Sequence, residues 1–140
     1  MCSMRHVPVL LNEVIESLQL KPGAKVVDCT LGDGGHAESI LERIGHAGKL
    51  LGIDVDAESL LRAKNNLYRF GEQVIYVRGN FAELKASVEK NNFTPVDAVL
   101  MDLGWSTPQF KERGRGFTFA ADEPLDMRFD PTNPTTAGDL

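Results

Sequence analysis

The residues best suited to chemistry begin at a glycine-rich loop, Gly32-Asp33-Gly34-Gly35. An apolar run over residues 25–30 precedes the loop, and apolar residues at helical spacing follow it up to Gly45. Glycine adopts positive φ and lets the backbone approach a ligand, and the N-terminus of the following helix presents N–H groups to that ligand. The sequence therefore predicts a nucleotide-binding turn between a strand and a helix.

Two classes of cofactor fit this loop. Residues 32–37 match the dinucleotide fingerprint G-x-G-x-x-A, and Asp54 lies at a suitable distance along the chain to bind a ribose. Asp28 favours the other class, because an acid inside an apolar strand is costly unless it has a function. Methyltransferases use an acid there, in a D-x-G-x-G-x-G pattern, to orient the loop and the amino-acid end of S-adenosylmethionine. Thr30 replaces the first glycine of that pattern.

Asp54 ends the second apolar run of the chain. A carboxylate accepts several hydrogen bonds, so Asp54 can hold both hydroxyls of a ribose. The alternative is that Asp54 caps a helix over residues 57–70, a role to which Asp56 is at least as well suited. We predict the ribose-binding role for Asp54.

Phe81 follows the third apolar run, next to Asn80. Asn80 is a suitable N-cap for a helix, with Glu83 at the capping-box position. Phe81 then has two interpretations. It flanks an adenine ring, or it is the first residue of a buried helical stripe that Leu84 and Val88 continue.

The segment Asp102-Leu103-Gly104-Trp105-Ser106-Thr107-Pro108-Gln109 follows the fourth apolar run. It resembles the polar, proline-containing loop of amino-group methyltransferases. The lone pair of a cytosine or adenine amine is drawn into the ring, so hydrogen-bond acceptors are needed to aim that pair at a methyl carbon. Such positioning can contribute up to about 7–11 kcal/mol. The alternative is a structured turn with Trp105 in the core. The predicted catalytic residues are Asp102, Ser106, Thr107 and Pro108.

These motifs need a sheet to bring them together. Strands are predicted at 25–30, 50–54, 74–77 and 96–101, and helices at 11–18, 37–44, 57–70 and 81–88. Alternating strands and helices indicate an α/β fold with a parallel sheet, and right-handed crossovers favour a doubly wound arrangement with strand order 3-2-1-4. The carboxyl ends of such strands form the ligand-binding edge.

Composition bounds the remaining possibilities. The chain has 140 residues, 42% of them hydrophobic, and a net charge of −5, which argues against a free-standing grip on nucleic acid but is compatible with RNA presented by a larger particle. Cys2 and Cys29 predict neither a disulfide nor a metal site, and the histidines lack paired ligand spacing. No membrane span or signal peptide is evident, so we predict a cytoplasmic protein.

The character of the sequence changes after Gly104. We predict a nucleotide-binding half-domain over residues 1–104 and a substrate-side loop segment over 105–140. The second segment has no clear periodicity and contains four prolines: Pro108, Pro124, Pro131 and Pro134. Stretches this long without secondary structure are functional loops or need partner structure.

Several motifs together resemble one family, the MraW or RsmH methyltransferases that modify a cytosine amine of small-subunit ribosomal RNA. The motifs lie at residues 6–11, 34–36, 102–109, 115–119 and 124–128. The resemblance implies a Rossmann-like class I methyltransferase fold and transfer of a methyl group from S-adenosylmethionine to a decoding-site cytidine in 16S RNA. It implies that segments 115–119 and 125–128 shape the substrate side. It implies cofactor contacts from Gly34, Gly35, His36, Asp54, Phe81, Asp102 and Gln109.

The chain departs from this family at three positions, Trp105, Thr107 and Glu123. Members of the family are also longer and carry a helical domain inserted after the fourth strand, so the chain is expected to be an N-terminal part, truncated after that strand. We then expect self-association through the exposed edge at residues 96–101. Two other functions stay open: a domain of an NAD-type oxidoreductase, and a non-catalytic fragment or binding module.

Overall fold

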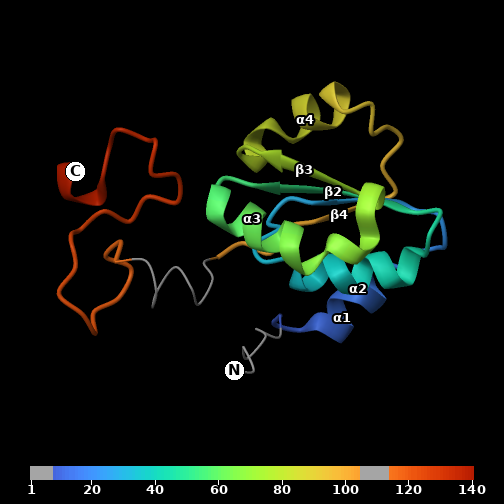
Figure 1. The fold of residues 1–140 in the computed structure, drawn as a ribbon, viewed down its shortest axis with the longest axis horizontal. Helices are drawn as coiled ribbons and strands as arrows, with labels where there is room; N and C mark the ends of the chain where they lie inside the picture. The colour runs from blue at the N-terminus through green and yellow to red at the C-terminus, as the bar shows by residue number, and fades with distance from the viewer. Residues whose placement is uncertain (1–7, 105–113) are drawn as a thin grey trace. The chain divides into compact units, whose positions relative to one another are not determined.

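A computed structural model describes residues 8–104 and 114–140. The chain divides into two compact units, Met1–Asp102 and Leu103–Leu140, and each is described by itself. The first unit contains all the strands and α-helices of the described chain, and the second consists mainly of turns (Figure 1).

The first unit is built on a parallel sheet. Its strands are β1 (Lys25–Asp28), β2 (Lys49–Asp54), β3 (Val74–Arg78) and β4 (Ala98–Leu100). They lie in the order β3-β2-β1-β4, as the sequence predicts.

β4 is shorter than the predicted strand at 96–101 because its flanking residues are paired with side chains. The carboxylate of Asp97 accepts from the Lys25 N–H at 2.7 Å, and the Asp102 N–H donates to the hydroxyl of Thr30 at 2.8 Å.

Helices cover both faces of the sheet. They are α1 (Leu11–Ser17), α2 (Gly35–Ile44), α3 (Ala57–Asn66) and α4 (Leu84–Lys90). α3 is shorter than predicted, because the chain tightens into a 3₁₀ helix over Tyr68–Gln73, in which Gly71 has φ 52° and ψ −124°. A second 3₁₀ turn, Phe81–Glu83, precedes α4, and Asn80 caps it by accepting from the Ala82 N–H, as predicted for that residue.

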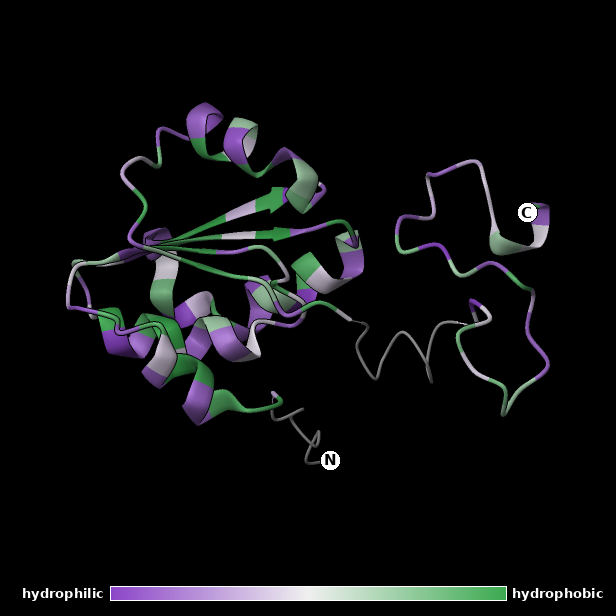
Figure 2. Ribbon diagram, turned by 180° about the vertical axis from the view of Figure 1, so that it is seen from behind, coloured by the Kyte–Doolittle hydropathy of each residue, from purple (hydrophilic) through white to green (hydrophobic). Residues whose placement is uncertain are grey.

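Two apolar clusters form the core, one on each face of the sheet. Val26 and Leu50 point toward α1, α2 and α3, whereas Val27 and Leu51 point toward α4, where Phe93 is also buried. Successive strand residues face opposite sides, so a strand covered on both faces is apolar throughout. Figure 2 shows this in the mostly green strands, which lie between helices that carry purple outer surfaces.

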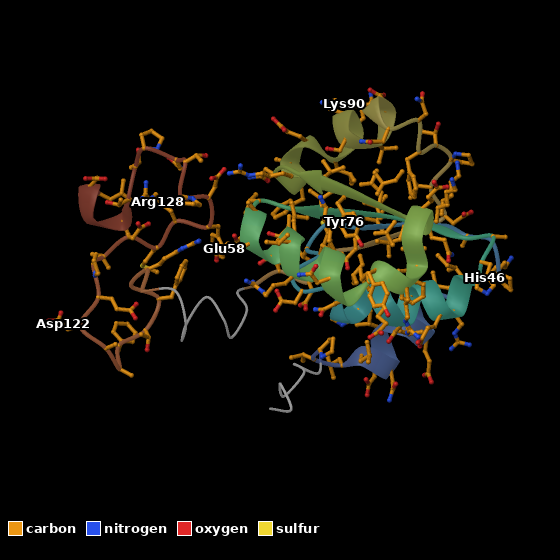
Figure 3. All side chains as sticks on the ribbon, in the orientation of Figure 1. His46, Glu58, Tyr76, Lys90, Asp122 and Arg128 are labelled. Atoms are coloured by element: carbon orange, nitrogen blue, oxygen red, sulfur yellow. The ribbon has the colours of Figure 1, made fainter. Side chains whose placement is uncertain are left out.

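Polar contacts hold the second unit together. The guanidinium of Arg128, labelled in Figure 3, donates to the Asp126 carboxylate at 2.7 Å and to two backbone carbonyls. Phe117 is buried, with its ring centroid 5.3 Å from that of Phe129. The regular structure in residues 114–140 is a 3₁₀ turn over Ala137–Asp139. Across both described ranges, no helix is long and apolar enough to cross a membrane.

Candidate functional site

Three acids lie where the strands end. Asp28 and Asp54 are the last residues of β1 and β2, and Asp102 follows β4 by two positions. Because the strands are parallel and adjacent, these acids share one edge of the sheet, and the loop from Thr30 to Gly34 leaves β1 between Asp54 and Asp102. Open α/β sheets bind ligands at such an edge.

The glycine loop needs its glycines for distinct reasons. Gly34 is the N-cap of α2 with φ 86°, and a Cβ there would lie 3.0 Å from a methyl carbon of Leu67. At Gly35 a Cβ would lie 2.4 Å from the Pro8 ring, so this position allows the N-terminal segment to approach α2. Gly34 has no side chain with which to cap α2, and the first N–H groups of the helix face the same edge as the acids.

Asp54 ties the end of β2 to the glycine loop. One carboxylate oxygen accepts from the Gly32 N–H at 2.8 Å, and the other accepts from the Asp56 N–H at 2.9 Å. The helix cap is Asp56, which accepts from the Glu58 N–H, so the alternative in which Asp54 caps α3 is wrong. A carboxylate has about four acceptor sites, so Asp54 has acceptor capacity beyond these bonds for the hydroxyls of a ribose. Burial raises the pKa of Asp54, and the Gly32 hydrogen bond partly offsets that rise.

Asp28 is the most deeply buried of the three acids. One of its oxygens accepts from the Thr30 N–H at 3.0 Å and lies 3.5 Å from the Thr30 hydroxyl. Burial raises the pKa of Asp28 to about 7, and the charges of Asp54 and Asp102 add to the rise while the Thr30 hydrogen bond opposes it. Because the charges of Asp54 and Asp102 disfavour ionisation of Asp28, negative charge is concentrated at this edge of the sheet.

Asp102 and His36 come together from distant parts of the sequence. An Asp102 oxygen lies 3.9 Å from Nδ1 of His36, and Nε2 of His36 lies 3.3 Å from the Val9 carbonyl. His36 is buried, whereas the Asp102 side chain is 56% exposed. The Asp102 carboxylate is therefore accessible to a ligand, while His36 joins the glycine loop to the segment before α1.

Phe81 is 41% exposed, in the 3₁₀ turn after β3. Its interpretation as the first residue of a buried stripe is therefore wrong, although Leu84 and Val88 of α4 do pack in the core. An exposed ring at a strand's carboxyl end can cover a flat ligand. The remaining predicted residues lie outside the described chain: Ser106, Thr107, Pro108 and Gln109, together with Trp105.

Three contacts around the glycine loop join residues that the sequence alone does not connect. Arg62 of α3 donates to the Asp33 carboxylate at 2.8 Å, and Asn66 donates to the Asp33 carbonyl at 2.9 Å. Together they fix the glycine loop on α3. In the sequence Thr30 is only a departure from a glycine pattern, yet in the structure its hydroxyl accepts from the Asp102 N–H. The hydroxyl at that position was the available signal, whereas nothing local to Arg62 indicates its partner.

The described residues offer little to a metal or to redox chemistry. Within residues 8–104 and 114–140, no group of three or more His, Cys, Asp or Glu residues is placed to hold a metal ion. Cys29 is a free, buried thiol, and burial raises its pKa to about 11, which keeps it protonated and unreactive.

Comparison with known proteins finds a match to one family. The family model described as the MraW methylase family matches residues 3–140. The chain is 49% identical over 138 residues to ribosomal RNA small subunit methyltransferase H of Desulfosudis oleivorans, which covers 99% of this chain and 44% of that protein. The chain thus spans less than half the length of the curated relatives it matches.

Solved structures agree at the level of fold. A proposed rRNA methylase from Clostridium thermocellum superposes with a TM-score of 0.60 at 21% identity, over 71% of this chain and 54% of that one. A SAM-dependent O-methyltransferase from Thermotoga maritima gives a TM-score of 0.51 at 21% identity, over 57% of this chain and 32% of its own. The first unit therefore has the Rossmann-like methyltransferase fold.

Proposed function

The chain belongs to the MraW methylase family, and on that premise we propose that it binds S-adenosylmethionine and serves in methylation of a cytidine amine in 16S ribosomal RNA. The substrate would be presented within the small ribosomal subunit, since a net charge of −5 gives the chain little attraction of its own for phosphates. A cytoplasmic location belongs to the same proposal.

The observation that carries the proposal is the group of three carboxylates that share the sheet edge beside the glycine loop. Burial is the main reason that the pKa of Asp28 is raised, and the charges of Asp54 and Asp102 raise it further. Negative charge of this density repels the pyrophosphate of a dinucleotide and attracts the sulfonium and ammonium groups of S-adenosylmethionine. The G-x-G-x-x-A spacing of residues 32–37 favours an NAD-type cofactor, but the surrounding charge opposes it.

The residues divide by the part of the cofactor they would meet. Asp54 would accept from the ribose hydroxyls with the acceptor capacity that its backbone donors leave open. Phe81 would lie against the adenine. The backbone of Gly34, Gly35 and His36 would hold the amino-acid end, with Gln109 contributing from the following loop.

Methyl transfer to a cytosine amine requires aim more than acid–base strength. S-adenosylmethionine supplies an electrophilic methyl group. Asp102, with Ser106, Thr107 and Pro108, would accept hydrogen bonds from the target amine and localise its lone pair toward that methyl group. The exposed Asp102 carboxylate has two oxygens, so one can accept from the target amine while the other meets the ammonium group of the cofactor.

We also propose self-association as a property of the β4 edge. Among the described strands β4 lies at the edge of the sheet, and its Val99 side chain is 43% exposed. An apolar edge strand is a template for pairing with another chain. Light scattering on Val99→Lys tests this, since the charge should yield a smaller particle than the unaltered chain forms.

Calorimetric titration tests the cofactor. The chain should bind S-adenosylhomocysteine and not NAD. Asp54→Ala should weaken binding of S-adenosylhomocysteine by about 2–4 kcal/mol, through loss of charge-assisted hydrogen bonds. Asp54→Asn keeps one acceptor oxygen toward the loop and should lose less. Glu72→Ala removes an exposed acid elsewhere in the same unit and serves as the charge-matched control.

Opposite results would overturn the proposal. NAD binding in place of S-adenosylhomocysteine binding would assign the loop to the dinucleotide class. Equal affinities for Asp54→Ala and Glu72→Ala would remove Asp54 from the site. Methylation is tested on small ribosomal subunits that lack the modification, with S-adenosylmethionine as donor.

A further inference from the structure

A short chain of hydrogen bonds joins β1 to the residue after β4. The Asp102 N–H donates to the Thr30 hydroxyl at 2.8 Å, and that hydroxyl lies 3.5 Å from an Asp28 oxygen, toward which it donates. The Thr30 N–H also donates to this oxygen at 3.0 Å. A threonine side chain thus links the buried acid of β1 to the exposed acid beyond β4.

The Thr30 hydroxyl provides the next link between the two chain segments after the backbone pairing of β1 and β4 ends. The last backbone bond between these strands runs from the Cys29 N–H to the Leu100 carbonyl at 2.9 Å. The chain after β1 then turns away into the glycine loop, so the Asp102 N–H has no strand carbonyl opposite it. By accepting that N–H, Thr30 fixes the Asp102 peptide, and with it the starting point of the Asp102 carboxylate. A glycine at position 30 would leave this to water.

The strand order tells which part of the cofactor Asp102 meets. β2, which carries Asp54, and β4 lie on opposite sides of β1. A cofactor with its ribose at Asp54 and its other end toward β4 would bring its amino-acid end to Asp102. An ammonium group there would meet an accessible carboxylate, 3.9 Å from the buried His36 ring.

We propose that Thr30 is a positioning residue: its hydroxyl holds the main chain of Asp102 so that this carboxylate receives the ammonium group of bound S-adenosylmethionine. The inference rests on the proposed cofactor and deepens it, because it assigns a distinct residue to the amino-acid end. Thr30 touches no part of the cofactor in this role and acts entirely through Asp102.

The test compares two ligands that differ only at the amino-acid end. S-adenosylhomocysteine carries the amino acid, and 5′-methylthioadenosine lacks it. Thr30→Val keeps the shape of the side chain and removes the hydroxyl, so it should weaken S-adenosylhomocysteine about five- to tenfold and leave 5′-methylthioadenosine unchanged. Thr30→Ser restores the hydroxyl and should restore the affinity. Equal thermal midpoints of the variants would show that folding is intact.

A double-mutant cycle then separates positioning from a local structural effect. Asp102→Ala should reproduce the selective loss, and adding Thr30→Val to it should cost nothing more, because the hydroxyl acts through the missing carboxylate. Additive losses, or equal weakening of both ligands by Thr30→Val, would overturn the role of Thr30. Failure of the unaltered chain to bind either ligand would instead overturn the proposed cofactor, so the two ideas fail separately.

Discussion

Each of the two units of this chain is stabilised internally by a different kind of interaction. The first unit buries a continuous set of aliphatic side chains on both faces of a sheet, whereas among residues 114–140 Phe117 is the single buried hydrophobic residue. The second unit depends on side chains that bond to the backbone, above all those of Arg115 and Arg128. Apolar burial is cooperative and extends through the layers, but a polar network loses its contacts one at a time.

The acids of the two units show the same difference. Burial and neighbouring acids raise the pKa of Asp28 to about 7, whereas hydrogen bonds from Arg128 lower the pKa of Asp126 to about 2. The first unit is thus strained by ionisation of its acid, and the second depends on ionisation. The two should respond to pH in opposite directions, which gives the comparison a direct test.

The largest effect should come from the apolar core. Leu51→Ala removes a fully buried side chain between β2 and α4, so the free energy of unfolding should fall by about 2–5 kcal/mol. Leu61→Ala, on a side chain of α3 that is 61% exposed, should change it by no more than about 0.5 kcal/mol. Urea unfolding measures both. If Phe117→Ala destabilised the first unit as much as Leu51→Ala, the difference between the units would disappear.

The next effect concerns Asp28 and pH. The folded state holds this proton up to about pH 7 and the unfolded chain only to about 3.8. The contribution of Asp28 to stability is therefore fully present below pH 3.8 and is lost as pH rises through about 7. The loss is at most about 4 kcal/mol. Asp28→Asn, which keeps the acceptor oxygen for Thr30, should therefore stabilise the fold at pH 8 and do little at pH 4. A gain of equal size at both pH values would show that ionisation of Asp28 is not the cause.

A smaller effect is expected at a glycine of the second unit. Gly116 has φ 71°, and a Cβ there would lie 2.3 Å from the Pro124 carbonyl oxygen. Gly116→Ala should cost roughly 1–3 kcal/mol locally. Gly114→Ala, at φ 57° with open space around it, should cost about 1 kcal/mol. Hydrogen exchange at the Met127 N–H, which donates to the Arg115 carbonyl, should accelerate more in the first variant. Unchanged exchange would mean that this turn absorbs a side chain.

The smallest effect is a local titration. Arg128→Lys replaces a planar fork with a point charge, so the pKa of Asp126 should rise from about 2 toward its ordinary 3.8. The interaction with residue 128 stabilises the ionised form of Asp126, so protonation of Asp126 weakens the network as pH falls. In the lysine variant this weakening should occur at a higher pH than in the unaltered chain. Carboxyl carbon shifts measure this. The pKa of Asp139 is lowered mainly by hydrogen bonds from Thr136, so that pKa should change little. Asp139 therefore serves as the internal reference.

The same difference decided what the sequence could predict. Apolar periodicity located the strands and most helices, and the handedness of crossovers gave their order, because burial on both faces of a sheet leaves a regular pattern. The predicted ends of elements are wrong where local geometry competes with the apolar pattern. α3 ends early where the chain tightens toward Gly71, and β4 is short because side chains cap its ends.

Contacts between distant polar residues left no such pattern. Thr30 and Asp102 are 72 positions apart, and Arg62 and Asp33 are 29 apart, so only the folded sheet shows that they meet. Phe81 is ambiguous in the sequence because an aromatic residue at a helix start fits both a core and a ligand site. The network around Arg128 has no period at all, which is why residues 105–140 were predicted only as loop.

The pairing of β1 with β4 also sets an order of events during translation. Asp28 pairs with Gly52 on one side and with Leu100 on the other, so β2 leaves the ribosome nearly fifty residues before β4 does. We expect the nascent chain to complete the Asp54 side of the loop first and to carry an open β1 edge in the meantime. Parallel strands so far apart in sequence assemble slowly. While that edge is open, the nascent chain has most need of protection by a chaperone or by a pause in synthesis.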